Sequence, residues 1–208
     1  TVEQMSLTNE SLITRARNTL AHSFLASDCD ALLFIDNDHR FDAKGVVRLV
    51  ESGKDIIGAI CPMKGINWDG VRRAALAGKE DLELYSGIFA VNVLPESMTF
   101  QAHQPIKVLD IGTGMMLITR RVFELLKPVC KSYINNSYTN IIPFGERVVE
   151  YFTTTITDKE VLLSEDYAFC AMWRSLGHDV WAAPWVKITH AGDYEFAGSF
   201  LHGLQLGN

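Results

Sequence analysis

Two carboxylates placed directly after an apolar segment are the side chains best suited to chemistry in this chain. Residues 31–35 are all apolar and run into Asp36 and Asp38, with Asn37 between them. Because an ionised carboxylate is very costly in an apolar interior, we expect both where a strand leaves its sheet. Ligands bind at that end of the strands in parallel α/β sheets. Carboxylate oxygens there suit Mg²⁺ or Mn²⁺ holding a phosphate group, although Asp-Asn-Asp is also ordinary turn composition.

A second acidic pair opens a predicted helix later in the chain. Ser164 is a suitable N-cap, and Gly177 ends the helix. Glu165 and Asp166 occupy its first turn, where acidic side chains often serve only the helix dipole and stabilise by about 0.3–1 kcal/mol. The functional alternative is a carboxylate aimed into a cleft, as a general base or as partner to positive charge on a sugar ring.

His190 and a glycine-rich segment are two further candidates. His190 follows a predicted strand at 186–189, and a neutral imidazole there can complete a carboxylate metal site. A structural histidine is the alternative. The segment Gly112-Thr113-Gly114 can bring backbone N–H groups close to a ligand, but it lacks the spacing of a dinucleotide-binding loop. Each signal is therefore weak when taken alone.

Polar side chains on the first predicted helix could face the same ligand. Apolar residues recur at helical spacing from Asn9 to Ala26, and Arg15, Arg17 and Asn18 lie on that helix. Arg15 and Arg17 are two residues apart and point in different directions, so at most one of them faces a ligand. A solvated surface arginine is the alternative.

The elements that must position these side chains alternate between helix and strand. The helix at 9–26 is followed by a strand at 30–36, a short helix and a buried strand at 55–60. This order predicts an α/β fold with a mixed, mostly parallel central sheet flanked by helices. The polar segments 63–80 and 131–147 are predicted to be long surface loops. Further strands are predicted at 82–93, 106–111 and 180–183, and helices at 120–126 and 164–176.

Composition and charge limit the classes of protein that fit. At 208 residues and 48% hydrophobic content, the chain suits one globular domain. Its net charge of −6 and the lack of a basic run argue against nucleic-acid binding. The four cysteines form no CxxC pair, which favours reduced thiols in a cytoplasmic setting over a zinc site. Without an 18-residue apolar run or a signal-like start, we expect no membrane span.

The order of these segments resembles that of the GT-A glycosyltransferases, nucleotide-sugar-dependent enzymes built on a single Rossmann-like sheet. The resemblance spans residues 12–195 and is nearest to viral and bacterial members, such as the capsid-glycosylating domains of large algal viruses. It implies one domain over 1–208, with a nucleotide- and metal-binding half at 1–110 and an acceptor and catalytic half at 111–208. The phrases that carry it are Ala16-Arg17-Asn18, Leu33-Phe34-Ile35-Asp36-Asn37-Asp38, Gly112-Thr113-Gly114-Met115-Met116-Leu117, Ser164-Glu165-Asp166-Tyr167 and Thr189-His190-Ala191-Gly192.

The resemblance also implies roles for the candidate residues. In that family the paired carboxylates bind Mn²⁺ or Mg²⁺, which bridges the diphosphate of the donor. Asp38 would be the direct ligand, Asp36 would contact the metal or the ribose, and His190 would be the third ligand. Asp166, together with Glu165, would be the catalytic carboxylate near the acceptor hydroxyl. The implied nucleotide-binding residues are Arg17, Asn18, Asp36, Asn37, Thr113 and Gly114.

These roles imply transfer of a hexosyl or deoxyhexosyl group from a nucleotide diphosphate sugar, with UDP as the expected nucleotide. The acceptor would be the hydroxyl of a glycan or of a protein-linked sugar. The metal site requires His190 to lie close to Asp38. One departure from the family is that nothing before Ser6 is long enough for its first, base-binding strand. The alternatives are a sugar nucleotidyltransferase, which would need a basic glycine-rich loop near the N-terminus, and a catalytically silent nucleotide-sugar-binding module.

Overall fold

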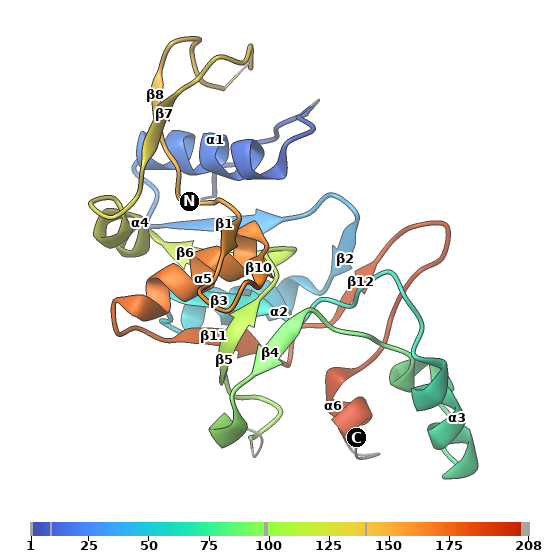
Figure 1. Ribbon diagram of the computed structural model, residues 1–208. Helices are drawn as coiled ribbons and strands as arrows, with labels where there is room; N and C mark the ends of the chain where they lie inside the picture. The colour runs from blue at the N-terminus through green and yellow to red at the C-terminus, as the bar shows by residue number, and fades with distance from the viewer. Residues whose placement is uncertain (1, 9, 98–99, 140, 205–208) are drawn as a thin grey trace. The chain divides into compact units, whose positions relative to one another are not determined.

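A computed structural model describes residues 2–8, 10–97, 100–139 and 141–204 (Figure 1). It shows an α/β protein in which helices flank a mixed central sheet, as the sequence predicted. In the described part of the chain, this sheet has the strand order β1 (Ala31–Ile35), β6 (Met115–Thr119), β3 (Ile56–Ala59), β11 (Val180–Ala183), β5 (Ile106–Ile111) and β4 (Val91–Val93). The helices are α1 (Ile13–Leu25), α2 (Ala43–Glu51), α3 (Trp68–Leu76), α4 (Arg120–Leu126), α5 (Glu165–Ser175) and α6 (Phe200–Leu204), with short 3₁₀ helices η1 (Leu82–Tyr85) and η2 (Pro95–Ser97).

The middle of the central sheet combines parallel and antiparallel pairing. Strand β11 runs parallel to β3 and antiparallel to β5, which in turn pairs antiparallel with β4. Every residue of β3 is buried, as expected for an apolar, β-branched strand covered on both faces. Gly58 is needed there, because a Cβ at this position would lie 3.2 Å from the Met115 carbonyl oxygen of the neighbouring strand.

A second, smaller sheet determines where the candidate ligands lie. It pairs β2 (His39–Phe41) antiparallel with β12 (Ile188–His190), in a register that sets His39 directly opposite His190. Directly opposed residues of an antiparallel pair project from the same face of the sheet. The two imidazoles therefore lie side by side, although they are far apart in the sequence.

The segment 63–80, predicted to be a long loop, contains helix α3, so that prediction was wrong. Its glycines were misleading. The Asn67 side chain caps the helix by accepting a hydrogen bond from the Gly70 N–H, at 2.9 Å. A Cβ at Gly70 would lie 2.5 Å from the Tyr85 carbonyl oxygen, so this glycine permits the close packing of α3 against η1.

Two other segments also differ from their predictions. The segment 131–147 contains strand β7 (Ser132–Ile134) and the start of β8 (Arg147–Val149), which pair antiparallel. Within 82–93, only β4 is extended into a strand, and η1 takes up the first residues. The first helix begins at Ile13, and Asn9, where the prediction began, lies outside the described residues.

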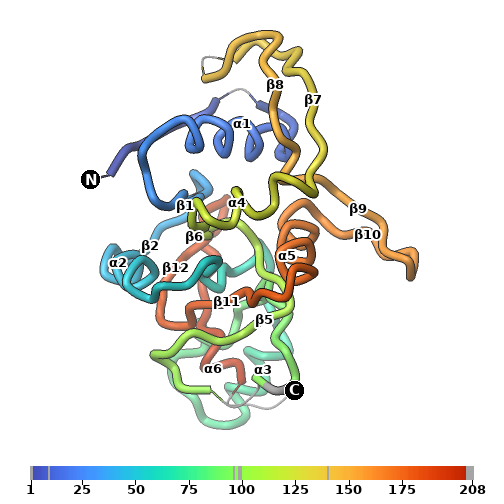
Figure 2. The backbone as a smooth tube through the Cα atoms, turned by 90° about the vertical axis from the view of Figure 1, so that its left-hand side faces the viewer, coloured from blue at the N-terminus to red at the C-terminus, as the bar shows by residue number. Residues whose placement is uncertain are grey.

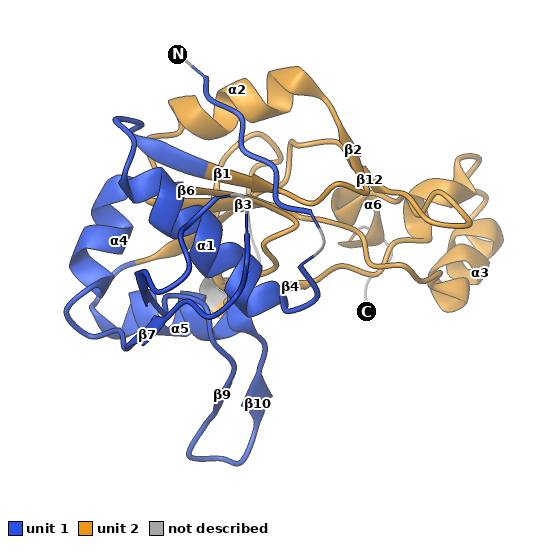
Figure 3. Cartoon of the chain, turned by 90° about the horizontal axis from the view of Figure 1, so that it is seen from above, with its two compact units in different colours: residues 1–32, 118–178 blue, residues 33–117, 179–208 orange. Residues whose placement is uncertain are grey.

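The chain divides into two compact units, each built from two stretches of sequence (Figure 3). The first unit comprises 1–32 and 118–178, and the second comprises 33–117 and 179–208. These units do not coincide with the expected halves at 1–110 and 111–208, and a single domain over 1–208 stays a prediction.

The first unit has an aromatic core and two hairpins. Phe123 contacts Phe24 and Tyr151, with ring centroids 5.7 and 5.0 Å apart, and Phe152 stacks on Phe169 at 4.4 Å. Figure 2 shows the two hairpins of this unit, one formed by β7 and β8 and the other by β9 (Thr155–Ile156) and β10 (Leu162–Leu163). Among the described residues, no helix combines the length and apolar character needed to cross a membrane.

Candidate metal centre

The two aspartates that end the first strand lie in a tight turn. The His39 N–H donates to the Asp36 carbonyl oxygen at 3.2 Å, which closes a β-turn over Asp36-Asn37-Asp38-His39. The Asp36 N–H donates to the Gly114 carbonyl oxygen at 2.9 Å and so fixes the start of the turn. The Ala191 N–H donates to the Asp38 carbonyl oxygen at 2.7 Å. Turn composition and ligand placement are therefore compatible here, because the turn holds Asp38 at the edge of the small sheet.

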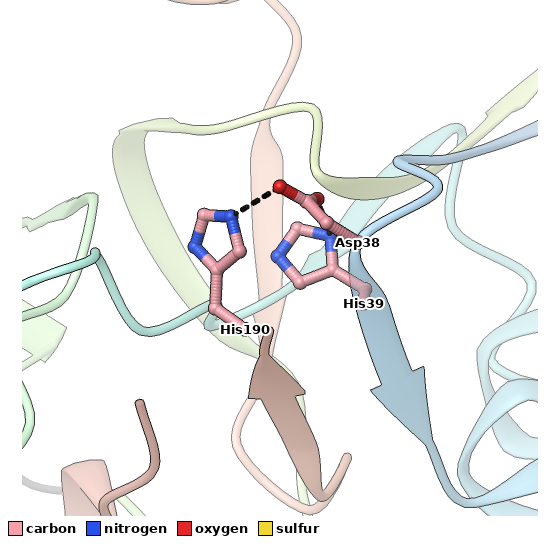
Figure 4. A group of neighbouring side chains, drawn as sticks. All are labelled: Asp38, His39 and His190. Carbon is pink, nitrogen blue, oxygen red and sulfur yellow. Dashed lines mark hydrogen bonds and ion pairs between the residues drawn. The ribbon is translucent and has the colours of Figure 1, made fainter. Parts of the chain in front are cut away.

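His190 contacts Asp38 through one ring nitrogen, as Figure 4 shows, and contacts the backbone through the other. Its Nε2 lies 3.0 Å from Asp38 Oδ2, and its Nδ1 lies 2.9 Å from the Pro62 carbonyl oxygen. A carbonyl oxygen can only accept, so Nδ1 carries a proton. In a neutral ring, Nε2 then points a lone pair at a carboxylate, an arrangement that calls for a proton or a metal ion between the two. A backbone carbonyl that orients the ring from behind is also typical of metal-bound histidines.

His39 is a third donor at this site, and sequence reasoning missed it. Its side chain is only 2% exposed, and neither ring nitrogen has a hydrogen-bond partner among the described residues. Its Nδ1 lies 3.9 Å from Asp38 Oδ1, and its ring centroid lies 4.4 Å from that of His190. Buried polar groups are almost always hydrogen-bonded, so this ring has the capacity to bind a ligand through its nitrogens.

Gly114 explains how the His39 ring reaches this position. A Cβ at Gly114 would lie 2.6 Å from His39 Cε1 and 3.3 Å from Cys61 Sγ. The imidazole therefore lies directly against the backbone of the Gly-Thr-Gly segment. The contribution of Gly114 that the structure shows is to make room for a side chain of the site.

The donor atoms of Asp38, His39 and His190 lie within 4.8 Å of one another. Two imidazoles and one carboxylate are a donor set that binds divalent transition ions in proteins. The buried nitrogens of His39 and the contact between His190 Nε2 and Asp38 Oδ2 both fit a cation placed among the three side chains. The residues present therefore suit a metal ion.

The protonation states of the site also favour metal binding. Burial would raise the pKa of Asp38, but hydrogen bonds from Lys64 and His190 outweigh it and hold that pKa below its usual value. Burial lowers the pKa of His39, and the neighbouring His190 lowers it further, against the opposite effects of Asp36, Asp38 and the Gly114 backbone. An ionised carboxylate and a neutral imidazole are the forms that bind metals.

Lys64 places a positive charge on the same carboxylate. Its Nζ lies 2.8 Å from Asp38 Oδ2, the oxygen that also contacts His190, and its side chain is 45% exposed. Its aliphatic part passes Gly192, where a Cβ would lie 3.7 Å from Lys64 Cδ. Lys64 therefore balances the carboxylate charge from the solvent side.

The other residues predicted for this end of the sheet lie around the cluster. Asp36 is not one of the three clustered donors, but its charge acts on both His39 and Cys61. Thr113 is 1% exposed, and its hydroxyl has no hydrogen-bond partner among the described residues. Asn37 is exposed at the turn. Metal or nucleotide contacts by these side chains stay predictions.

The remaining predicted residues belong to the first compact unit. The structure brings Arg17 and Glu165 together, with Nε 3.2 Å from Oε1 and both side chains largely buried. Asn18 is 2% exposed, and its amide bonds both backbone groups of Phe152, at 2.8 and 2.9 Å. This gives Asn18 a structural role, and a nucleotide contact by Arg17 or Asn18 stays a prediction.

Asp166 lies in the first turn of α5, as its position in the sequence suggested. Its Oδ1 accepts hydrogen bonds from the Tyr167 N–H, at 2.8 Å, and from the Ser164 hydroxyl. The carboxylate therefore helps to begin the helix, which is the structural alternative considered above. Its other oxygen, Oδ2, takes no part in these two contacts, and the catalytic roles of Asp166 and Glu165 stay predictions.

Comparison with known proteins gives little to set beside this geometry. No protein-family model matches the chain. No curated protein sequence is similar to it. Among solved structures, the chain is similar to one described as "Crystal Structure of A197 from STIV", with a TM-score of 0.48 and 16% sequence identity over 91% of this chain and 78% of that one.

Proposed function

We propose that this protein is a metal-dependent glycosyltransferase. It would move a sugar from a nucleotide diphosphate donor, a UDP-sugar, to the hydroxyl of a glycan or of a protein-linked acceptor. The observation that carries the proposal is the 3.0 Å contact between His190 Nε2 and Asp38 Oδ2. Two residues selected from the sequence as partners in one donor site meet at the edge of a small sheet, with a third donor beside them.

Asp38 and His190 would hold the divalent cation, Mn²⁺ or Mg²⁺. When bound, the cation supplies electrostatic stabilisation of the diphosphate leaving group, a large term in catalysis of this kind. His190 is oriented for this by Pro62, and the lowered pKa of Asp38 keeps its carboxylate ionised at neutral pH. Asp36 and Asn37 precede the cluster in the same turn and are proposed to contact the ribose.

Asp166 is the proposed catalytic carboxylate. In a single displacement, its free oxygen accepts the proton of the acceptor hydroxyl. The acceptor oxygen forms a bond to the anomeric carbon while the bond from that carbon to the diphosphate oxygen breaks, and the electron pair leaves with the diphosphate. Glu165 would add negative charge beside the oxocarbenium-like centre.

The proposal is tested by measuring nucleoside diphosphate release from a panel of UDP-sugars with Mn²⁺, with and without glycan acceptors. Asp38→Asn should abolish release, because it removes the anionic ligand. Asp69→Asn is the matched control, since the Asp69 side chain is 79% exposed and forms a surface ion pair with Arg72. Pyrophosphate exchange instead of diphosphate release would indicate a nucleotidyltransferase, and donor binding with neither reaction would indicate a silent binding module.

A further inference from the structure

We propose that His39 is the third protein ligand of this site, and that its imidazole makes the site select a transition-metal ion over Mg²⁺ and Ca²⁺. This inference deepens the proposed function and depends on its metal site. The expected ligand is a first-row divalent ion that accepts nitrogen donors, such as Co²⁺, Zn²⁺ or Mn²⁺. Without His39, the protein ligands would be one imidazole and carboxylate oxygens.

Burial of the His39 ring favours its role as a ligand. The His39 side chain is 98% buried, yet neither of its ring nitrogens makes a hydrogen bond within the described residues. A buried donor or acceptor without a partner is costly to leave, which is why such groups are rare. A coordinated ion would give one of these nitrogens the partner that it lacks.

The register of the small sheet also favours this role, because it places His39 beside His190. Pairing of β2 with β12 sets His39 opposite His190, and their rings lie on one face with centroids 4.4 Å apart. This placement follows from backbone pairing of the two strands. Both imidazoles are thus held by the backbone, as a preorganised site requires.

The distances between the donor atoms are close to those that a single ion requires. Ligands bound at about 2.1 Å to a single ion stand roughly 3.0–3.4 Å apart for tetrahedral or octahedral angles. His190 Nε2 and Asp38 Oδ2 are already 3.0 Å apart, and His39 Nδ1 is 3.9 Å from Asp38 Oδ1. All three donor atoms lie within 4.8 Å of one another. Side-chain shifts of roughly 1–1.5 Å would bring them into the range set by a single ion. Figure 4 shows the two rings and the carboxylate gathered at one place.

The chemistry of the donors then determines which ions the site prefers. Mg²⁺ and Ca²⁺ bind oxygen ligands, and Mg²⁺ gives up its waters reluctantly. Imidazole nitrogen favours the later first-row ions, so two imidazoles and one carboxylate should rank Zn²⁺ and Co²⁺ above Mn²⁺, and Mn²⁺ above Mg²⁺. A site using Asp36 and Asp38 as its main ligands would show a much weaker preference.

The test is calorimetric titration of the whole chain with each metal ion alone. Wild type should bind one equivalent of Co²⁺ at least about 100-fold more tightly than Mg²⁺. His39→Ala should weaken Co²⁺ binding by at least about tenfold, since even residues behind a ligand contribute that much, while Mg²⁺ binding changes little. The control is His103→Ala, because His103 is exposed. Equal binding of Mg²⁺ and Co²⁺ by wild type would overturn the inference, as would unchanged Co²⁺ binding by His39→Ala.

A second measurement on wild type covers the case in which His39→Ala fails to fold. X-ray absorption of the Co²⁺-loaded protein should count two imidazole ligands, and a count of one would contradict the inference. These outcomes are separate from those for the proposed function. Failure to release diphosphate from any UDP-sugar would overturn glycosyl transfer and leave the metal result intact. Diphosphate release by wild type, together with unchanged Co²⁺ binding by His39→Ala, would overturn the inference about His39 and leave glycosyl transfer intact.

Discussion

His39 and His190 face each other across a two-stranded ladder, with ring centroids 4.4 Å apart and Asp38 beside both. The pairing ties the site to the backbone of two three-residue strands. Any change that disturbs this face should alter metal binding before it alters the fold. The predictions for Lys64 and Gly114 concern this arrangement and the contacts around it.

Lys64→Ala should increase metal affinity. The Lys64 ammonium contacts Asp38 Oδ2 and competes there with any incoming cation. Exposed ion pairs are worth about 0.2–1 kcal/mol, so the increase should reach at most about fivefold and should shrink in high salt. Calorimetry with Co²⁺ in the absence of nucleotide measures it. Lys79→Ala is the control, because Lys79 is exposed. Unchanged or weaker binding in Lys64→Ala would show that the two cations do not compete.

Gly114→Ala should weaken metal binding without removing a ligand. The added Cβ would lie 2.6 Å from His39 Cε1, so the ring must move away from the position that the small sheet gives it. We expect a loss of about tenfold in Co²⁺ affinity, comparable to the loss of a group that orients a ligand. Gly203→Ala is the control, since nothing lies within 4 Å of a Cβ there. If Gly114→Ala binds Co²⁺ normally, the ring does not depend on this packing.

Asn18→Ala should destabilise the first compact unit. The Asn18 amide satisfies both the N–H and the carbonyl oxygen of Phe152, and all of these groups are buried. Losing these two buried hydrogen bonds should cost about 1–3 kcal/mol in the free energy of unfolding. Urea denaturation measures this cost, with exposed Asn136→Ala as the control. Normal stability with weakened UDP binding would instead support the nucleotide contact suggested by sequence.

The α/β class and most strand positions could be predicted from hydrophobic patterning, because runs such as those of β1, β3 and β5 are short and rich in apolar residues, as is typical of strands. Helix α3 could not be predicted in this way, because Gly70 is typical of a loop when the sequence is considered alone. In the structure, Gly70 is required by close contact with the Tyr85 backbone, and the local sequence gives no sign of that contact. Such packing constraints are visible only in the folded chain.

The candidate site was also predictable in part from the apolar pattern of the strands. Asp38 and His190 stand at the ends of recognisable strands, and they meet although 152 residues separate them. His39 directly follows the second aspartate, but its position as a donor depends on the register of β2 with β12. Strands of three residues are too short to show a register in sequence. An imidazole beside a carboxylate pair was the one signal available.

Asp166→Asn should keep metal and donor binding but lose glycosyl transfer. The amide preserves the size of the side chain and can still accept from the Tyr167 N–H, so helix α5 should begin where it does now. It cannot take a proton from the acceptor hydroxyl, and transfer should fall by about 10²–10⁴-fold. Acceptor-dependent UDP release, measured beside calorimetric titration with UDP and metal, separates the two effects.

The matched control for that variant is Ser164→Ala, which removes the hydroxyl bond to the Asp166 carboxylate while leaving the carboxylate itself. Losing this contact should cost at most about 1 kcal/mol of stability and should leave transfer near its normal rate. If both variants lose transfer equally, Asp166 acts through the start of α5 and not as a base. Normal transfer in Asp166→Asn would assign the base to another residue, with Glu165 the next candidate because it adjoins Asp166 in the same helical turn.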